Sequence, residues 1–281
     1  MAARVPTPYS TGLELILCSC ERELYMVLTE DEELICATVW ALQDRATELL
    51  APSLERMFAL AGKNFSDLRR IGCVRGPGSF TGIRLVLATA SALRRTTRAQ
   101  LAALDYMQAL ATTLAMQEHL LYGRTIWIVT HARRNLVHCT PFLSYGPVIP
   151  AVALRPVELL TPDQVQEQLA ACAADSDSPV LVAGSALTRQ KDFCAALEAM
   201  RDQGIATRSL VRPSIDALRL LGRHGDYFPK DVEPLYIRPC DAVDNLPSLS
   251  VRMGRDPEQS EACLERLLHV EPGDQSRELS D

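Results

Sequence analysis

Short apolar runs separated by polar turns open the chain. Such runs are typical of an antiparallel meander of strands. The three runs are Leu13–Cys18, Leu24–Leu28 and Leu34–Val39. The apolar spacing then becomes helical over residues 46–61. A buried strand at 71–74 leads into the glycine-rich segment 76–82, and a second helix is predicted over 83–95. The first part of the chain is therefore predicted to form an α/β lobe around a strand, glycine loop and helix.

A similar alternation begins again after residue 123. Two apolar runs, Thr125–Val129 and Leu136–Phe142, flank a polar turn and predict a hairpin. Helices and strands then alternate as far as a helix over 214–221, which we assign to this second part. The sequence predicts the α/β class, with two similar lobes over residues 12–104 and 105–240 and a polar tail over 241–281.

Composition and charge fit a folded protein whose charge imbalance lies at one end. Of 281 residues, 47% are hydrophobic and 23% are charged, and the formal net charge is −6. Residues 241–281 contain ten acidic and four basic side chains, so the rest of the chain is formally neutral. A neutral body argues against coating nucleic acid through bulk charge. The nine cysteines lack C-x-x-C spacing and no run approaches eighteen apolar residues, so we expect reduced thiols, no membrane span and a cytoplasmic protein.

The glycine loop is the main candidate for chemistry. Free N–H groups at a helix start favour an anion, and the candidate anion-site residues are Gly76, Gly78, Ser79, Thr81 and Gly82. However, no lysine follows as a Walker motif requires, and Pro77 and Thr81 stand where a nucleophile elbow needs glycines. The residues alone leave two alternatives open: a ligand site, or a strand-to-helix turn capped by a hydroxyl. No histidine pair suits a metal, and we predict neither a metal site nor a catalytic residue.

The two helices beside this loop carry more apolar surface than one sheet can cover. A helix that is apolar on several sides packs against a second helix of its own chain or against another protein. The candidate interface residues are Leu49, Leu50, Leu54, Met57, Leu60, Ile83, Leu85, Val86, Ala88 and Ala92. Internal packing and a partner surface both remain open at this point.

The ten-residue run from Arg75 to Arg84, RGPGSFTGIR, closely resembles the TsaB (YeaZ) family of bacterial tRNA threonylcarbamoyladenosine biosynthesis proteins. The likeness extends from about residue 13 to 241. It implies two ribonuclease H-like lobes of the actin-like ATPase superfamily, in its glycoprotease-like branch. It also implies a non-catalytic subunit that docks on a TsaD-like catalytic subunit through helices 46–61 and 81–95. A TsaE-like ATPase and tRNA would join in that complex, which modifies the adenosine next to the anticodon. Without TsaD, the same face would form a homodimer.

Two turns depart from the family pattern. Cys18 and Ser19 stand where the family commonly has Asp-Thr, and His131 precedes Ala132-Arg133 where an aspartate is common. A thiol and a neutral imidazole do not replace carboxylates that hold a magnesium-bound nucleotide. We therefore interpret Cys18, Ser19, His131 and Arg133 as a degenerate nucleotide site and expect no tightly bound cofactor, with ATP and divalent metal only on partner subunits. The alternatives are a glycoprotease-like hydrolase or divergent kinase, and a homodimeric binding protein with a changed role.

Overall fold

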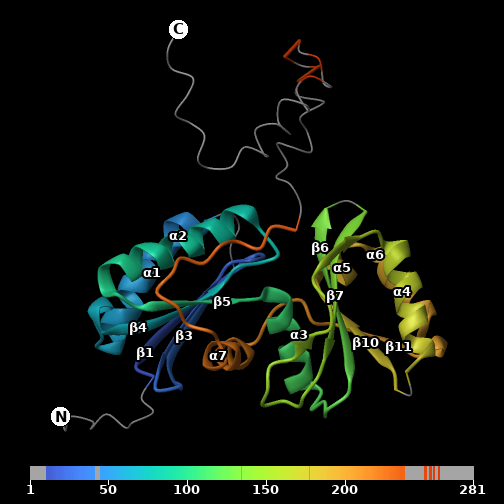
Figure 1. Cartoon of the computed structure of the whole chain (residues 1–281), viewed down its shortest axis with the longest axis horizontal. Coiled ribbons are helices and arrows are strands. Elements are labelled where there is room, and N and C mark those ends of the chain that lie inside the picture. The colour runs from blue at the N-terminus through green and yellow to red at the C-terminus, as the bar shows by residue number, and fades with distance from the viewer. Residues whose placement is uncertain are drawn as a thin grey trace. The chain divides into compact units, whose positions relative to one another are not determined.

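A computed structural model describes residues 11–41, 45–133, 135–176 and 178–237, with residues 250, 251, 253, 254, 256 and 259. The chain divides into two units, 1–237 and 238–281. Most of the predicted tail, residues 241–281, lies outside the described residues. The first unit has two sheets with helices packed on them (Figure 1), which confirms the predicted α/β class.

The first sheet has five strands in the order β3-β2-β1-β4-β5. Its bounds are β1 Leu13–Cys18, β2 Glu23–Glu30, β3 Glu33–Ala41, β4 Leu68–Val74 and β5 Gln100–Leu104. The first three strands form the predicted antiparallel meander, whereas β4 and β5 run parallel to β1. Because β1 lies in the middle, all six of its residues are buried.

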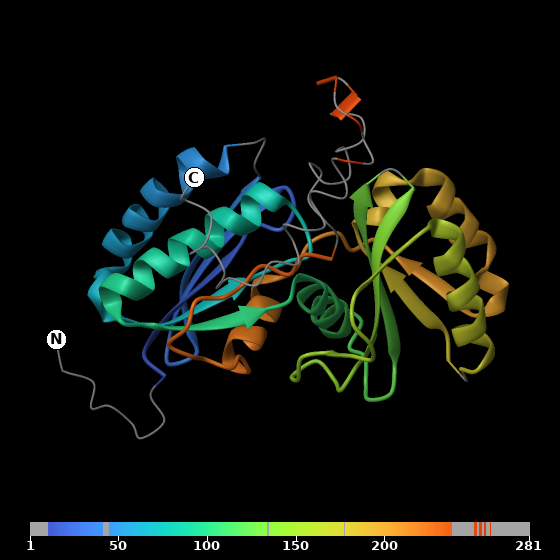
Figure 2. The same ribbon diagram turned by 45° about the horizontal axis from the view of Figure 1, so that its top comes forward.

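Helices α1 (Ala46–Ala61) and α2 (Phe80–Thr97) cover one face of this sheet, and the short 3-10 helix η1 (Phe65–Asp67) lies between them in sequence (Figure 2). α1 begins and ends where the sequence predicts. It ends because Gly62 adopts a left-handed conformation, with φ of 64°, and donates its N–H back to Ala59. α2 starts three residues before the prediction, directly from the glycine loop.

The second sheet has the strand order β11-β10-β6-β7-β8, with β9 also paired to β7. Its strands are β6 Thr125–Arg133, β7 Leu136–Leu143, β8 Val152–Ala153, β9 Glu158–Leu160, β10 Val180–Ala183 and β11 Ile205–Arg208. Its helical elements are α3 Tyr106–Gln117, α4 Pro162–Ala174, α5 Ser185–Arg189, α6 Lys191–Ala199 and the 3-10 helix η2 Arg201–Gln203. None of the described helices is long and apolar enough to cross a bilayer.

Helix α7 (Ile215–Arg223) returns to the first sheet, although the sequence division assigned this segment to the second lobe. Its buried residues Leu218 and Leu221 join the core that contains β1 and β2. The chain then runs on along β5, where Leu101 and Phe228 form a bridge and Leu235 donates its N–H to the Arg75 carbonyl. The sequence predicts that the helix has an apolar side, but periodicity does not identify the sheet that receives it.

Candidate functional site

The glycine loop packs directly on the turn between β1 and β2. Ser79 donates its N–H to the Cys20 carbonyl at 2.6 Å. A Cβ atom added to Gly78 would lie 2.0 Å from that same oxygen, and one added to Gly82 would lie 2.1 Å from the Ser19 carbonyl oxygen. Only glycine permits this approach. Two carbonyl oxygens of the chain therefore cover one side of the loop, where they repel an anion.

Ser79 is the N-cap of α2. Its hydroxyl oxygen accepts a hydrogen bond from the N–H of Gly82 at 3.2 Å. This is the contact expected for the second predicted alternative, a strand-to-helix turn capped by a hydroxyl. Thr81, another of the candidate anion-site residues, is an exposed residue inside the helix. Gly76 contributes its carbonyl to the N–H of Tyr106, so the loop also fixes the start of α3. The hydroxyl of Ser79 therefore has a structural role at the helix start.

The turn after β1, which we predicted to be a degenerate part of a nucleotide site, contains buried thiols. Cys18, Ser19 and Cys20 are each at most 2% exposed. Burial raises the pKa of the Cys20 thiol well above its usual value, and its Sγ lies 3.6 Å from the Val74 carbonyl oxygen. A thiol that stays protonated at neutral pH is a poor ligand for a metal ion. Among the described residues, no group of three or more histidine, cysteine, aspartate or glutamate side chains is placed to hold one.

The other predicted degenerate position, His131 near the end of β6, contacts the start of α5. His131 donates its backbone N–H to the hydroxyl of Ser185 at 3.0 Å, and its Nδ1 lies 3.4 Å from Nε2 of Gln190. Burial and the nearby Arg189 lower the pKa of the imidazole, so His131 is neutral at pH 7. Arg133 ends β6 and is exposed. A neutral imidazole supplies no charge for holding a phosphate or its metal.

A hydrogen bond links the two turns. Ser185 donates its hydroxyl proton to the carboxylate of Glu21, which belongs to the turn after β1. Burial raises the pKa of Glu21. Sequence reasoning missed both residues. The available signal was Gly184-Ser185, because this pair follows a buried strand and starts a helix in the same way as the glycine loop does.

The structure also corrects the predicted partner interface. Leu50, Leu54, Met57, Ile83 and Val86 are at most 4% exposed and pack in the core of the chain itself. They are therefore not available to a partner in the folded protein. Leu49 and Leu85 are half-buried, whereas Leu60, Ala88 and Ala92 are exposed. The apolar surface that α1 and α2 present to solvent is thus narrower than the sequence predicted.

Two α/β lobes, in which a glycine turn packs on the hairpin of β1 and β2, define this chain as a mixed α/β protein with two sheets. A family model described as "TsaD: tRNA N6-adenosine threonylcarbamoyltransferase" matches residues 42–222, and the chain belongs to this family.

Solved structures support the same assignment. YeaZ from Pseudomonas aeruginosa is 19% identical, with a TM-score of 0.62, and the match covers 80% of this chain and 99% of that one. An uncharacterized protein from the same organism, described as similar to peptidase YEAZ, is 17% identical, with a TM-score of 0.63 and the same coverage. At these identities the likeness shows a shared fold. Together with the family match, it confirms the predicted resemblance to the TsaB (YeaZ) family. No curated protein matches the sequence.

Proposed function

We propose that this chain is a TsaB-like accessory subunit that binds a TsaD-type catalytic subunit in tRNA adenosine modification. The observation that carries the proposal is the outward surface of α1 and α2. Leu60 is 80% exposed at the end of α1, and Ala88 and Ala92 lie one helical turn apart on the exposed side of α2. Small side chains let a second helix approach closely, and an exposed leucine gains from burial in a complex.

The two turns support a role without catalysis. In this proposal, the Cys18 thiol and the neutral imidazole of His131 stand where carboxylates would manage a nucleotide. The Ser79 hydroxyl caps a helix, and no described histidine or carboxylate is hydrogen-bonded to it. In this proposal, ATP and divalent metal belong to the partner subunits, which are TsaD-like and TsaE-like, and tRNA is bound through the complex.

The hydrolase and kinase alternatives lack support in these contacts. A nucleophilic serine needs a base within hydrogen-bond reach, and Ser79 has the N–H of Gly82 as its partner instead. The homodimer remains compatible with the same surface, because an exposed apolar patch associates with a second copy when its partner is absent. We therefore propose a homodimer as the state of the isolated chain, formed through α1 and α2.

The test compares two exposed leucines. Leu60→Glu places a charge on the proposed docking surface, whereas Leu121→Glu places the same charge at a 75% exposed position after α3. Both proteins should fold, because neither side chain belongs to the core. Binding to the TsaD-type subunit of the same cell is measured by calorimetry, and the oligomeric state of the isolated chain is measured by light scattering.

Leu60→Glu should weaken binding at least tenfold and dissociate the homodimer, because a charge buried without a partner is costly. Leu121→Glu should bind as the wild type does. The content of threonylcarbamoyladenosine in tRNA from cells that carry each variant should follow the same order. If both variants bind the TsaD-type subunit equally well, the docking surface lies elsewhere.

A further inference from the structure

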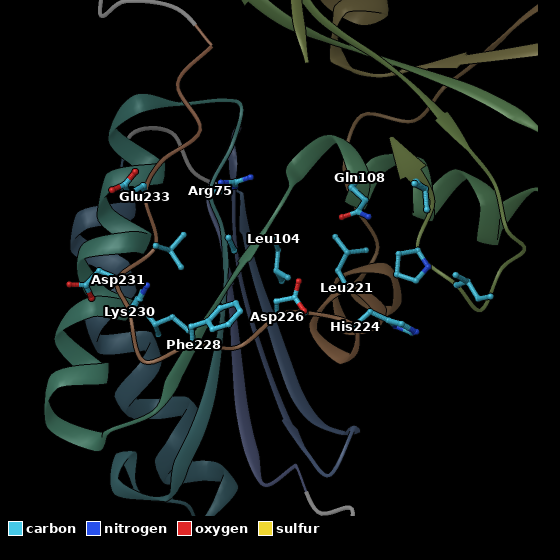
Figure 3. A pocket seen from close by; sticks show the side chains of 17 residues that line it. Arg75, Leu104, Gln108, Leu221, His224, Asp226, Phe228, Lys230, Asp231 and Glu233 are labelled. Atoms are coloured by element: carbon cyan, nitrogen blue, oxygen red, sulfur yellow. The ribbon is translucent and has the colours of Figure 1, made fainter. Parts of the chain in front are cut away.

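We propose that a groove along the outer edge of β5 binds an extended polypeptide segment of a partner protein, with a basic side chain next to apolar ones. The cavity has a volume of about 710 Å³. We call it the β5-edge groove. It is lined by β5, the end of α7, the chain after α7 and the loop before β8 (Figure 3). It does not involve the exposed faces of α1 and α2, so this inference is independent of the proposed function.

The groove contains an open sheet edge. β5 is the last strand of its sheet, and the Leu104 carbonyl faces β4 because it accepts the N–H of Arg75. The N–H and C=O of Leu101 face away from β4, and both are hydrogen-bonded to the backbone of Phe228. Strand alternation turns the N–H and C=O of Ala103 outward as well. No described residue pairs with them, so they are free to bond an added strand.

The rest of the chain leaves this edge open. After Phe228 the chain crosses to α2, where Asp231 pairs with Arg94 at 2.9 Å. It returns only at Leu235, whose N–H bonds to Arg75. Six residues, 229–234, therefore lie between these two points of attachment, and this segment bends away from Ala103. On the other side, the loop before β8 is held to α3, because the Gln108 amide donates to the Ala151 carbonyl at 2.9 Å.

The walls suit alternating apolar side chains. Phe228 is 56% exposed, and Ile149 and Val152 are 44% and 45% exposed; all three line the groove. An extended peptide directs alternate side chains to opposite sides. When such a peptide pairs with Ala103, its main chain supplies affinity and these apolar walls receive every second side chain.

The charges of the groove select a basic ligand. Arg75 pairs with Asp105, and Asp231 pairs with Arg94. Lys230 and Glu233, which also line the groove, offset each other. The remaining charge is Asp226, which has no ion pair among the described residues and lies near Leu104 in the middle of the groove (Figure 3). A lysine or arginine of the ligand would neutralise this carboxylate.

The same charge argues against the chain's own tail as the occupant. Residues 241–281 carry ten acidic and four basic side chains, so the net charge of this segment has the same sign as Asp226 and does not favour it as the occupant. A segment of another protein with the opposite charge satisfies both the open edge and the carboxylate. We therefore assign the groove to a basic, extended segment of a partner.

The test uses the full chain and three synthetic peptides. The first is acetyl-Val-Lys-Val-Lys-Val-amide, the second has glutamates in place of the lysines, and the third is the lysine peptide with N-methylated valines. Calorimetry measures binding, and the NMR shift of the Ala103 amide locates it. The protein variants are Asp226→Lys, Ala103→Pro and the control Asp202→Lys, which reverses an exposed charge in η2, outside the lining of the groove.

The lysine peptide should bind at least tenfold more tightly than the other two and should shift the Ala103 amide. Asp226→Lys should reverse the preference for lysine over glutamate, and Asp202→Lys should leave it unchanged. Ala103→Pro should abolish binding, because proline has no N–H to offer. If Ala103→Pro does not fold, Asp226→Lys and the N-methylated peptide still decide the matter. The proposal is overturned if no peptide binds at about 1 mM, where even a weak complex forms, or if lysine and glutamate peptides bind alike.

Discussion

The close contact between the glycine loop and the turn after β1 makes Gly82→Ala a sharp test of the site geometry. The new Cβ would lie 2.1 Å from the Ser19 carbonyl oxygen and 2.8 Å from the Ser19 Oγ. Real Cβ contacts are essentially never shorter than 3.0 Å, so the loop and the turn must separate by about 0.9 Å. Ser79 bonds to the neighbouring Cys20 carbonyl at 2.6 Å, and this hydrogen bond would lengthen as the loop moves.

Two destabilising contributions and one stabilising contribution determine how far Gly82→Ala changes the free energy of unfolding. Overpacking costs about 1–3 kcal/mol, and the weakened hydrogen bond costs about 0.5–1.5 kcal/mol. Alanine is a better helix former than glycine by about 1 kcal/mol, which offsets part of the loss because Gly82 lies inside α2. The free energy of unfolding should therefore fall by about 1–3 kcal/mol. For a unit of this length, each kcal/mol lowers the Tm by about 2–4 °C.

Urea unfolding followed by circular dichroism measures this loss, and Thr81→Ala is the control. Thr81 is exposed, one position earlier in the same helix, so its substitution should change the stability by no more than about 0.5 kcal/mol. If Gly82→Ala is as stable as the wild type, the loop does not pack on the Ser19 carbonyl, and our account of the glycine loop is wrong.

Three further predictions concern the same lobe and its turns. Ser79→Ala should cost about 1 kcal/mol of stability, as expected for an N-cap, and should leave tRNA modification in complementation assays nearly intact; complete loss by a stable variant would point to a chemical role. Glu14→Gln should stabilise the protein more at pH 8 than at pH 4. Burial raises the pKa of Glu14 in the folded protein above its usual value. The wild type therefore loses stability as the pH rises from the pKa of Glu14 in the unfolded chain through its pKa in the folded protein, whereas the glutamine variant does not. Equal gains in stability at both pH values, measured by urea titration, would contradict this. The isolated chain should give no calorimetric signal with magnesium-ATP, because His131 is neutral; micromolar binding that His131→Ala removes would contradict the degenerate-site interpretation.

Local patterns predicted most of the elements. The meander β1 to β3 follows from short apolar runs between polar turns, and the hairpin of β6 and β7 follows from two apolar runs that flank a polar turn. These features depend on residues close in sequence. The helix spacing of α1 was predicted for the same reason, since Leu50 and Leu54 fall on one side of it.

Long-range placement could not be predicted. Glu21 and Ser185 are 164 positions apart, and no periodicity in either segment points to the other. The apolar character of α1 and α2 was clear from the sequence, but which leucines face the sheet depends on how the helices rotate on it. Leu54 is therefore in the core and Leu60 is exposed, although both were predicted to belong to one interface.

The return of α7 to the first sheet has a consequence for how the protein forms during synthesis. Residues 11–104 leave the ribosome first, but α7 covers β1, β2 and β5 and is made more than a hundred residues later. Gly222 of α7 lies against Ile16 and the buried carboxylate of Glu14. Until α7 emerges, this face of the sheet is exposed to water and to other nascent chains. The first lobe is thus completed only after the whole second lobe has been translated.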